Sequence, residues 1–515
     1  MQTNKEEMVT KRFSFLNAIE KIGNLLPHPA ILFVLLITIL MIASAIASAY
    51  GLSIDDPRKV GSQISIVSLL SMKEFVHFAS HTVSNFTNFP PLGTVLIAML
   101  GVGIAEASGF LSTAIRALVL NSPKKLITLI IVFAGIMSNL VSDFGYVVLV
   151  PLAAMIFHSL GRHPLAGIAA AFAGVSGGFS ANLLIGTLDP IMSGITQEAS
   201  RLIDPTYVVG VEANWYFMCV STFLITFLGY FVTEKIVEPR LGKYQGEVEE
   251  GGIKKLSQLE KKALLFAFLG VSIYVALVLL CILPQDSLFR NPKTGSLIGS
   301  PFFKGIIFFV FFSFAIPGII YGLITKSIKN ATNIVEAMAG GMKTMAMYLV
   351  IIFFAAQFIK LFEWSNFGPY LAIQGANLLK SADLNPALLL ILFVLVSATI
   401  NLLISSASAQ WALIAPIFVP MLMLLGYAPE VIQAAYRIGD STTNLITPLL
   451  AYLPVILAVA IRYKPDTKMG TMISMMFPYT VAFLIGWCFL LYLWVFVFNL
   501  PVGPGAALEY VVNKP

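Results

Sequence analysis

Long apolar runs recur along the whole chain, and each is long enough to form a helix that crosses a membrane. The hydrocarbon layer of a bilayer is about 30 Å thick and requires about 20 apolar residues in helical form. A transmembrane β-barrel would show short segments of alternating polarity, and these runs do not alternate. We therefore predict an all-α integral membrane protein with about nine transmembrane helices, at residues 30–50, 92–120, 163–190, 214–234, 262–283, 302–324, 339–364, 429–461 and 470–499.

Two further segments, 124–160 and 386–426, each contain two apolar arms around a polar centre. The arm 125–138 would form a helix of about 21 Å at 1.5 Å per residue, which is too short to cross the bilayer. Non-helical backbone is tolerated at membrane depth where it lines a cavity. We interpret both segments as re-entrant hairpins whose tips stop inside the bilayer. Two ordinary crossings joined by a short loop would give a similar pattern.

A pattern of proline and glycine residues occurs twice, at a constant offset of 265 positions. The residues Pro151, Gly161, Pro164 and Gly174 recur as Pro416, Gly426, Pro429 and Gly439. The pattern predicts two repeats, 88–234 and 337–500, separated by a loop at 235–261 and connecting helices within 262–324. One hairpin is expected to enter from the cytoplasm and the other from outside, so the repeats are inverted. Inverted repeats supply the two related conformations that alternating access requires.

Each hairpin is followed by a crossing that its own residues should interrupt. Segment 163–190 contains three glycines near its middle and ends on Asp189-Pro190. Segment 429–461 contains the polar run 439–444 and then Pro448. Glycine costs about 1 kcal/mol in a helix interior and proline about 3 kcal/mol. We therefore predict two broken helices, whose free amide and carbonyl groups could hold an anion and a cation.

Composition and charge support a multi-pass membrane protein. The chain is 58% hydrophobic and only 11% charged, whereas soluble domains carry about 25% charged residues. The net charge of +6 does not indicate nucleic-acid binding, because lysines and arginines gather in clusters that alternate with the crossings, at 5–21, 116–125, 235–262, 326–343 and 462–468. The positive-inside rule then places the N-terminal residues 1–29 in the cytoplasm. We expect a bacterial inner-membrane protein.

Four charged residues lie in or beside membrane-depth segments: Asp143, Asp189, Arg437 and Asp440. A charge at the bilayer centre costs at least about 2.5–3.5 kcal/mol, so four of them within the repeats favour a polar cavity. Arg437 and Asp440 are three positions apart on one helix, where side chains can meet. Their pairing could be purely structural, or Asp440 could carry a proton or ion with Arg437 as its partner or as a carboxylate anchor. For Asp189, a plain cap or loop position is an alternative almost as strong as a role in transport.

Uncharged residues add candidate ligand contacts. Ser408 and Trp411 are three positions apart at the second hairpin tip, where an indole face could stack on an aromatic ligand. Trp411 corresponds to Tyr146 in the first repeat, although a tryptophan in a membrane protein can also be an interface anchor. Asn182 and Asn444 occupy matching positions in the broken helices and offer oxygens to a cation such as sodium. No metal-ligand pattern or Walker-type loop is evident, and no cofactor is expected.

With these residues in view, the chain resembles the p-aminobenzoyl-glutamate transporter (AbgT) family, and especially its efflux-type members. The most specific blocks are 26–29, 161–167, 408–411, 415–421, 436–441 and 500–505. The resemblance implies a homodimer of nine-helix, two-hairpin protomers that move p-aminobenzoyl-glutamate or export sulfonamide antimetabolites by using the proton gradient. The positions matching residues important in efflux-type members are Asp189, Ser408, Trp411, Pro429, Arg437, Asp440 and Pro448. All seven retain the family residue.

The leading hypothesis is a proton-coupled antiporter for p-aminobenzoyl-glutamate, p-aminobenzoate-like folate precursors or sulfonamides. An importer of p-aminobenzoyl-glutamate, coupled to protons or to sodium, is the first alternative. An intramembrane aspartyl protease using Asp189 and Asp440 is a remote one, because proteolysis does not require an inverted repeat. A passive channel would conduct without a gradient-coupled carboxylate.

Overall fold

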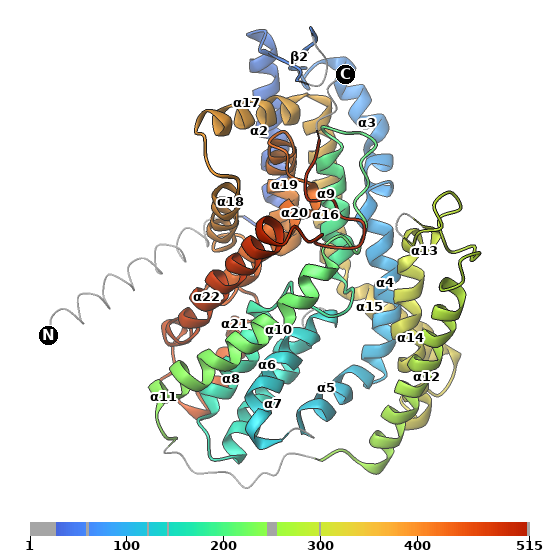
Figure 1. Ribbon diagram of the computed structural model, residues 1–515, viewed down its shortest axis with the longest axis vertical. Helices are drawn as coiled ribbons and strands as arrows, with labels where there is room; N and C mark the ends of the chain where they lie inside the picture. Colours follow the sequence, from blue (N-terminus) through green and yellow to red (C-terminus); the bar gives the residue numbers. More distant parts are fainter. Residues whose placement is uncertain are drawn as a thin grey trace, which may run out of the picture.

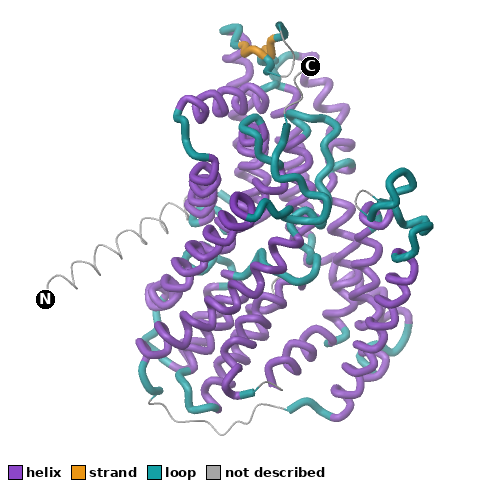
Figure 2. The backbone as a smooth tube through the Cα atoms, in the orientation of Figure 1, coloured by secondary structure: helices purple, strands orange, loops and turns teal. Residues whose placement is uncertain are grey.

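The computed structural model describes residues 27–57, 61–120, 123–141, 144–244, 255–297 and 300–511. Helices make up most of this part of the chain, and loop segments pass through the middle of the molecule (Figure 2). The strands described are β1 (Ser53–Asp55) and β2 (Gln63–Ser65), a small antiparallel pair at one end of the molecule. The predicted all-α membrane fold is confirmed.

Seven helical segments of the described chain are long and apolar enough to span a membrane on their own. They correspond to seven of the nine predicted crossings. The helices that form them are α2 (Pro29–Ala49), α3 (Met72–Thr87) with α4 (Pro90–Ala107), α10 (Trp215–Val232) with η4 (Thr233–Val237) and α11 (Glu238–Leu241), α12 (Gln258–Ile282), α14 (Ile306–Thr325), α16 (Ala346–Trp364), and α22 (Met469–Tyr492) with η5 (Leu493–Val497). The other two predicted crossings are the broken helices described below.

Two of the predicted crossings have different boundaries in the structure. The run 92–120 is not one helix, because α4 ends at Ala107 and α5 (Phe110–Leu120) begins after a turn. Gly109 in this turn has a φ of +83°, a conformation that suits glycine and stops the helix. The run 339–364 likewise divides at Met345 into α15 (Ala331–Thr344) and α16. Hydropathy did not reveal either break, because a bent pair of helices is as apolar as a straight one.

Both predicted hairpins are two short helices around a break. The first consists of η1 (Lys124–Leu126), α6 (Ile127–Ser138), η2 (Asn139–Val141) and α7 (Phe144–Ser159), and the second of α18 (Pro386–Asn401) and α19 (Ala407–Met423). The α6 arm has 12 residues and the longest arm, α19, has 17. Each arm is therefore shorter than a full crossing needs.

The two hairpins open toward opposite ends of the molecule. At the base of the first, Arg162 forms ion pairs with Glu234 in η4 and with Glu238, the first residue of α11, and α11 lies at the lower end in Figure 1. At the base of the second, Tyr427 forms a β-bridge with Glu509 in the C-terminal segment, which runs through the upper half. Short helices α13 (Pro301–Lys304) and α17 (Phe367–Ser381) also lie in the upper half. Hairpins that open in opposite directions are expected when two repeats are inverted relative to each other.

Both predicted broken helices are present, but the breaks begin later than the sequence suggested. The first runs from α8 (Pro164–Phe172) through the π-turn η3 (Ala173–Gly177), is non-helical over 178–187, and continues as α9 (Leu188–Ser200). Asp189 therefore lies at the start of the second half-helix, not at the far end of the crossing. The second runs from α20 (Pro429–Thr443) across a break at 444–452 to α21 (Leu453–Tyr463).

The repeated glycines Gly174 and Gly439 permit close packing and do not themselves break the helices. A Cβ on Gly439 would lie 2.5 Å from the carbonyl oxygen of Val394 in the first arm of its hairpin. A Cβ on Gly174 would collide in the same way with the carbonyl oxygen of Val132. Each broken helix is thus seated against the first arm of its own hairpin, which explains why these two glycines recur.

The variant Gly439→Ala is therefore expected to destabilise the folded protein by about 1–3 kcal/mol, because the added methyl group overpacks a backbone contact. Thermal or dodecyl-sulfate unfolding of the purified protein in detergent would measure the loss. Gly340→Ala is the matched control, since a Cβ there meets nothing within 4 Å. Equal unfolding midpoints for the two variants would contradict this account of Gly439.

Candidate functional site

A polar cavity of about 330 Å³ lies where the two hairpin tips meet the two broken helices. We call it the central cavity. Its walls combine residues of the first hairpin, the first break, the second hairpin tip and the second break. These residues are Asn139, Tyr146, Phe179, Thr187, Leu188, Ile191, Ser405, Ser406, Ala407, Ser408, Asn444, Leu450, Ala451 and Tyr452. The structure therefore brings the four interrupted segments of the repeats to one place.

One buried asparagine ties each hairpin tip to its own broken helix. Asn139 donates to the carbonyl oxygen of Val175 at 3.0 Å. Asn401 donates to the carbonyl oxygen of Asp440 at 2.6 Å and to Oδ1 of Asn444 at 2.8 Å. Sequence reasoning did not assign these roles. The signal was present, because Asn139 and Asn401 are separated by 262 positions, the same offset that relates Asn182 to Asn444.

The two broken helices are joined by an ion pair and two hydrogen bonds. Nη1 of Arg437 on α20 lies 2.7 Å from Oδ1 of Asp189 on α9, and Nη2 donates to the carbonyl oxygen of Ser180 at 2.9 Å. The backbone N–H of Ser180 donates to Oγ of Ser441 at 3.1 Å. The expected pairing of Arg437 with Asp440 is therefore not observed in this conformation. Asp189 is closer because it begins α9 directly opposite α20.

Asp440 has a different environment from Asp189. Its residue is 1% exposed, and neither carboxylate oxygen has a hydrogen-bond partner among the described residues. The neighbouring hydroxyl of Tyr436 donates to the carbonyl oxygen of Ala407 at 2.6 Å. A buried carboxylate without a donor is costly as an anion. Binding a proton or a cation would remove that cost.

Trp411 does not line the central cavity. Its side chain is fully buried, its ring stacks on Tyr436 with centroids 4.3 Å apart, and its indole N–H donates to Oγ1 of Thr196 at 2.9 Å. Its repeat counterpart Tyr146 lines the cavity instead and stacks on Tyr452, with centroids 4.7 Å apart and planes 3° apart. The aromatic surface available to a ligand thus comes from Tyr146, Tyr452 and Phe179, and Trp411 fixes α19 against α9 and α20.

The remaining predicted site residues fall at the ends and breaks of the same elements. Ser408 and Asn444 line the central cavity, whereas Asn182 lies in a small space beside the Asp189–Arg437 pair. Pro429 is the first residue of α20, and Pro448 lies in the break that follows it. Asp143 lies outside the described residues.

Inverted hairpin and broken-helix units that close on one polar cavity define a multi-pass membrane transporter. The comparison with known proteins agrees: residues 14–510 match the model of the AbgT transporter family, and the chain belongs to this family. The family consists of transporters and not of enzymes, so the protease hypothesis for Asp189 and Asp440 is wrong.

Similar proteins support this assignment over almost the whole chain. The p-aminobenzoyl-glutamate transport protein of Escherichia coli (strain K12) is 38% identical over 487 residues, which is 95% of each chain. The crystal structure of the Alcanivorax borkumensis YdaH transporter matches with a TM-score of 0.88 at 43% identity, over 93% of this chain and 100% of that one. Neisseria gonorrhoeae MtrF, described as illuminating a class of antimetabolite efflux pumps, matches with a TM-score of 0.90 at 55% identity, over 96% of this chain and 100% of MtrF.

Proposed function

We propose that the chain is a proton-coupled antiporter of the bacterial inner membrane that exports sulfonamide antimetabolites and p-aminobenzoyl-glutamate-like compounds. The efflux function named for MtrF and the substrate named for the E. coli relative support this proposal. The protomer is proposed to work as a homodimer with a cytoplasmic N-terminus.

The observation that carries the proposal is the position of the central cavity between hairpins that open toward opposite ends of the molecule. Two tips of this kind can each act as a gate for one side of the membrane. Alternating access requires that one gate opens while the other stays closed. A passive channel would require no such duplicated gate. Accumulation of substrate against its concentration gradient would identify a transporter, because a channel cannot accumulate substrate.

The cavity offers separate surfaces for the two ends of an aromatic carboxylate. The Tyr146–Tyr452 pair provides aromatic faces for a ring. Ser406 and Ser408, at the beginning of α19, place hydroxyl groups and the N-terminal end of a helix in the same cavity. Helix N-termini favour anions, so we assign the carboxylate or the sulfonyl group to this end. Asp440 is proposed to exchange the proton.

Counterflow in proteoliposomes tests this function directly. With purified protein, we expect labelled p-aminobenzoyl-glutamate and a labelled sulfonamide to exchange, and an imposed pH gradient to drive net movement. Vesicles prepared in potassium buffers without sodium should behave in the same way. Flux that requires sodium would show that sodium, and not the proton, is the coupling ion. Net inward movement under a physiological gradient would favour the importer. If neither compound exchanges, the proposal is overturned.

A further inference from the structure

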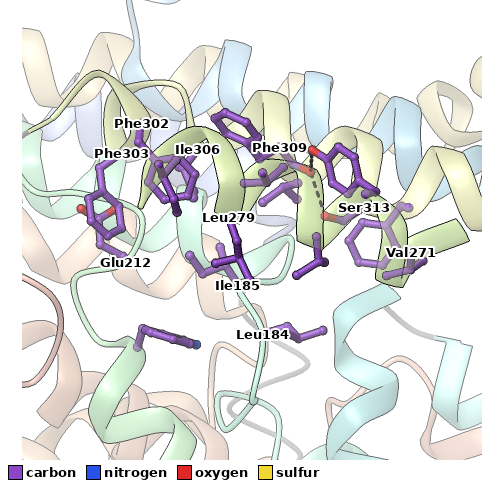
Figure 3. Close-up of a pocket in the computed structure, with 17 residues that line it drawn as sticks. Leu184, Ile185, Glu212, Val271, Leu279, Phe302, Phe303, Ile306, Phe309 and Ser313 are labelled. Atoms are coloured by element: carbon purple, nitrogen blue, oxygen red, sulfur yellow. Dashed lines mark hydrogen bonds between the residues drawn. The ribbon is translucent and has the colours of Figure 1, made fainter. Parts of the chain in front are cut away.

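A second and larger recess lies away from the central cavity, between α12, α14 and the residues around the first helix break (Figure 3). We call it the lateral crevice. It has a volume of about 410 Å³, within the range of small-molecule sites. One stripe of α12, with Val271, Val275 and Leu279, forms one wall. The opposite wall is formed by Leu184 and Ile185.

Many of the side chains on the crevice wall are aromatic, and most of its polar groups already have partners. The hydroxyl groups of Tyr274 and Ser313 both donate to the carbonyl oxygen of Phe309, at 3.1 and 2.8 Å. The indole N–H of Trp215 donates to the carbonyl oxygen of Leu183 at 2.9 Å. Tyr274 and Trp215 therefore present mainly their ring surfaces to the crevice, and the hydroxyl of Ser313 is already paired.

Glu212 is the exception. It lies beside Phe302 and Phe303 at one end of the crevice (Figure 3). The residue is 8% exposed, and its Oε2 has no hydrogen-bond partner among the described residues. An unsatisfied buried carboxylate oxygen is costly, and a ligand N–H would satisfy it. The crevice therefore combines aromatic walls with one buried acceptor at its end.

The lateral crevice adjoins the ion pair that joins the two broken helices. Leu184, Ile185 and Trp215 line both the crevice and the small space that contains Asp189 and Arg437. Leu184 and Ile185 belong to the non-helical segment 178–187, which is tethered to the pair through the N–H of Gly186, 2.6 Å from Oδ2 of Asp189. A ligand in the crevice would thus touch the segment that Asp189 holds.

We propose that the lateral crevice binds uncharged aromatic amines, with the amino group donating to Glu212 and the ring between α12, α14 and Trp215, and that it is a membrane-side access site for the transporter. The inference rests on the proposed function, and it names sulfonamides with a free arylamine as the substrate class that uses this route. An acyl chain would fill the apolar walls but would leave Glu212 without a donor.

Photolabelling tests the crevice without any transport measurement. The probe is 4-aminobenzophenone, and 4-methoxybenzophenone is the matched probe without an N–H donor. In the purified protein we expect adducts of the amine within residues 271–282 and 302–314, located by mass spectrometry, and expect excess sulfanilamide to suppress them. Removing the acceptor with Glu212→Leu should lower labelling by the amine about tenfold, with Glu212→Gln intermediate. Labelling by the methoxy probe should not change.

Two controls keep the test decisive. Asp286→Asn removes an exposed carboxylate in the loop after α12 and should leave labelling unchanged. Val275→Trp fills the crevice from a position that is 44% exposed on α12 and should block both probes. Adducts that Glu212→Leu does not reduce, or that sulfanilamide does not suppress, would overturn the inference and indicate a lipid-filled or unrelated groove. Because labelling needs no gradient, a failure of counterflow alone would reject the proposed function and not the crevice.

Discussion

Proteoliposomes containing the Asp440→Asn variant are expected to accumulate no substrate under an imposed pH gradient, with uptake falling to the level of protein-free vesicles. The side chain keeps its size, so the central cavity and its surroundings should persist. What the variant loses is the ability to alternate between a charged and a protonated form. The proposed coupling proton is assigned to Asp440 because this residue is 1% exposed and its oxygens have no donor among the described residues.

Exchange without a gradient tests the direction of coupling in the same preparation. Counterflow of labelled sulfonamide by Asp440→Asn should also be lost, because a neutral residue at this position resembles the protonated carrier, which in an antiporter returns without substrate, whereas a symporter would keep exchanging. Asp466→Asn, which changes an exposed aspartate after α21, should retain both activities. Gradient-driven accumulation by Asp440→Asn at the rate of the unmodified protein would remove Asp440 from the coupling mechanism.

The repeat pattern predicted much of the architecture, because local residues determine where helices can start and stop. Glycine is expected at both positions, 174 and 439, if each broken helix packs closely on the first arm of its own hairpin. The structure shows this close backbone contact at Gly174 and at Gly439. The arm 125–138 was recognisable because its length prevents a crossing, whereas the longer arms left two ordinary crossings open. Breaks such as the one at Met345 were invisible, because hydropathy does not reveal where one apolar helix ends and the next begins.

The pairing of side chains was harder to predict than their presence in the site. Arg437 and Asp440 are three residues apart, and that spacing suggested a bond that the structure does not contain. The true partner, Asp189, is 248 positions away, and only the crossing of α9 and α20 brings it close. Trp411 and Tyr146 show the same limit. The repeat pairs the two positions, but Trp411 is buried by stacking on Tyr436, whereas Tyr146 lines the cavity.

Removing one member of the Asp189–Arg437 pair is expected to destabilise the protein by about 3–5 kcal/mol, because the remaining charge stays buried without its partner. Arg437→Leu should show the larger loss, since Arg437 is 3% exposed and also satisfies the carbonyl oxygen of Ser180. Asp189→Asn should lose less, because its amide oxygen can still accept from one of the two donors, Gly186 or Arg437, and only the other hydrogen bond is lost. Unfolding in detergent would measure both losses, with Arg240→Leu as a control at an exposed arginine.

The double variant Asp189→Asn/Arg437→Leu, which combines the two single changes, distinguishes a direct pair from two independent effects. If the charges act mainly on each other, the double variant should be more stable than the sum of the single losses predicts, by about 0.5–3 kcal/mol for residues in contact. Additive losses would contradict the pairing. Transport should not recover in the double variant. The Asp189–Arg437 pair connects α20 to the non-helical segment 178–187, and residues of this segment line both the central cavity and the lateral crevice. Restored stability with lost transport would therefore show that this link works in the transport cycle and not only in folding.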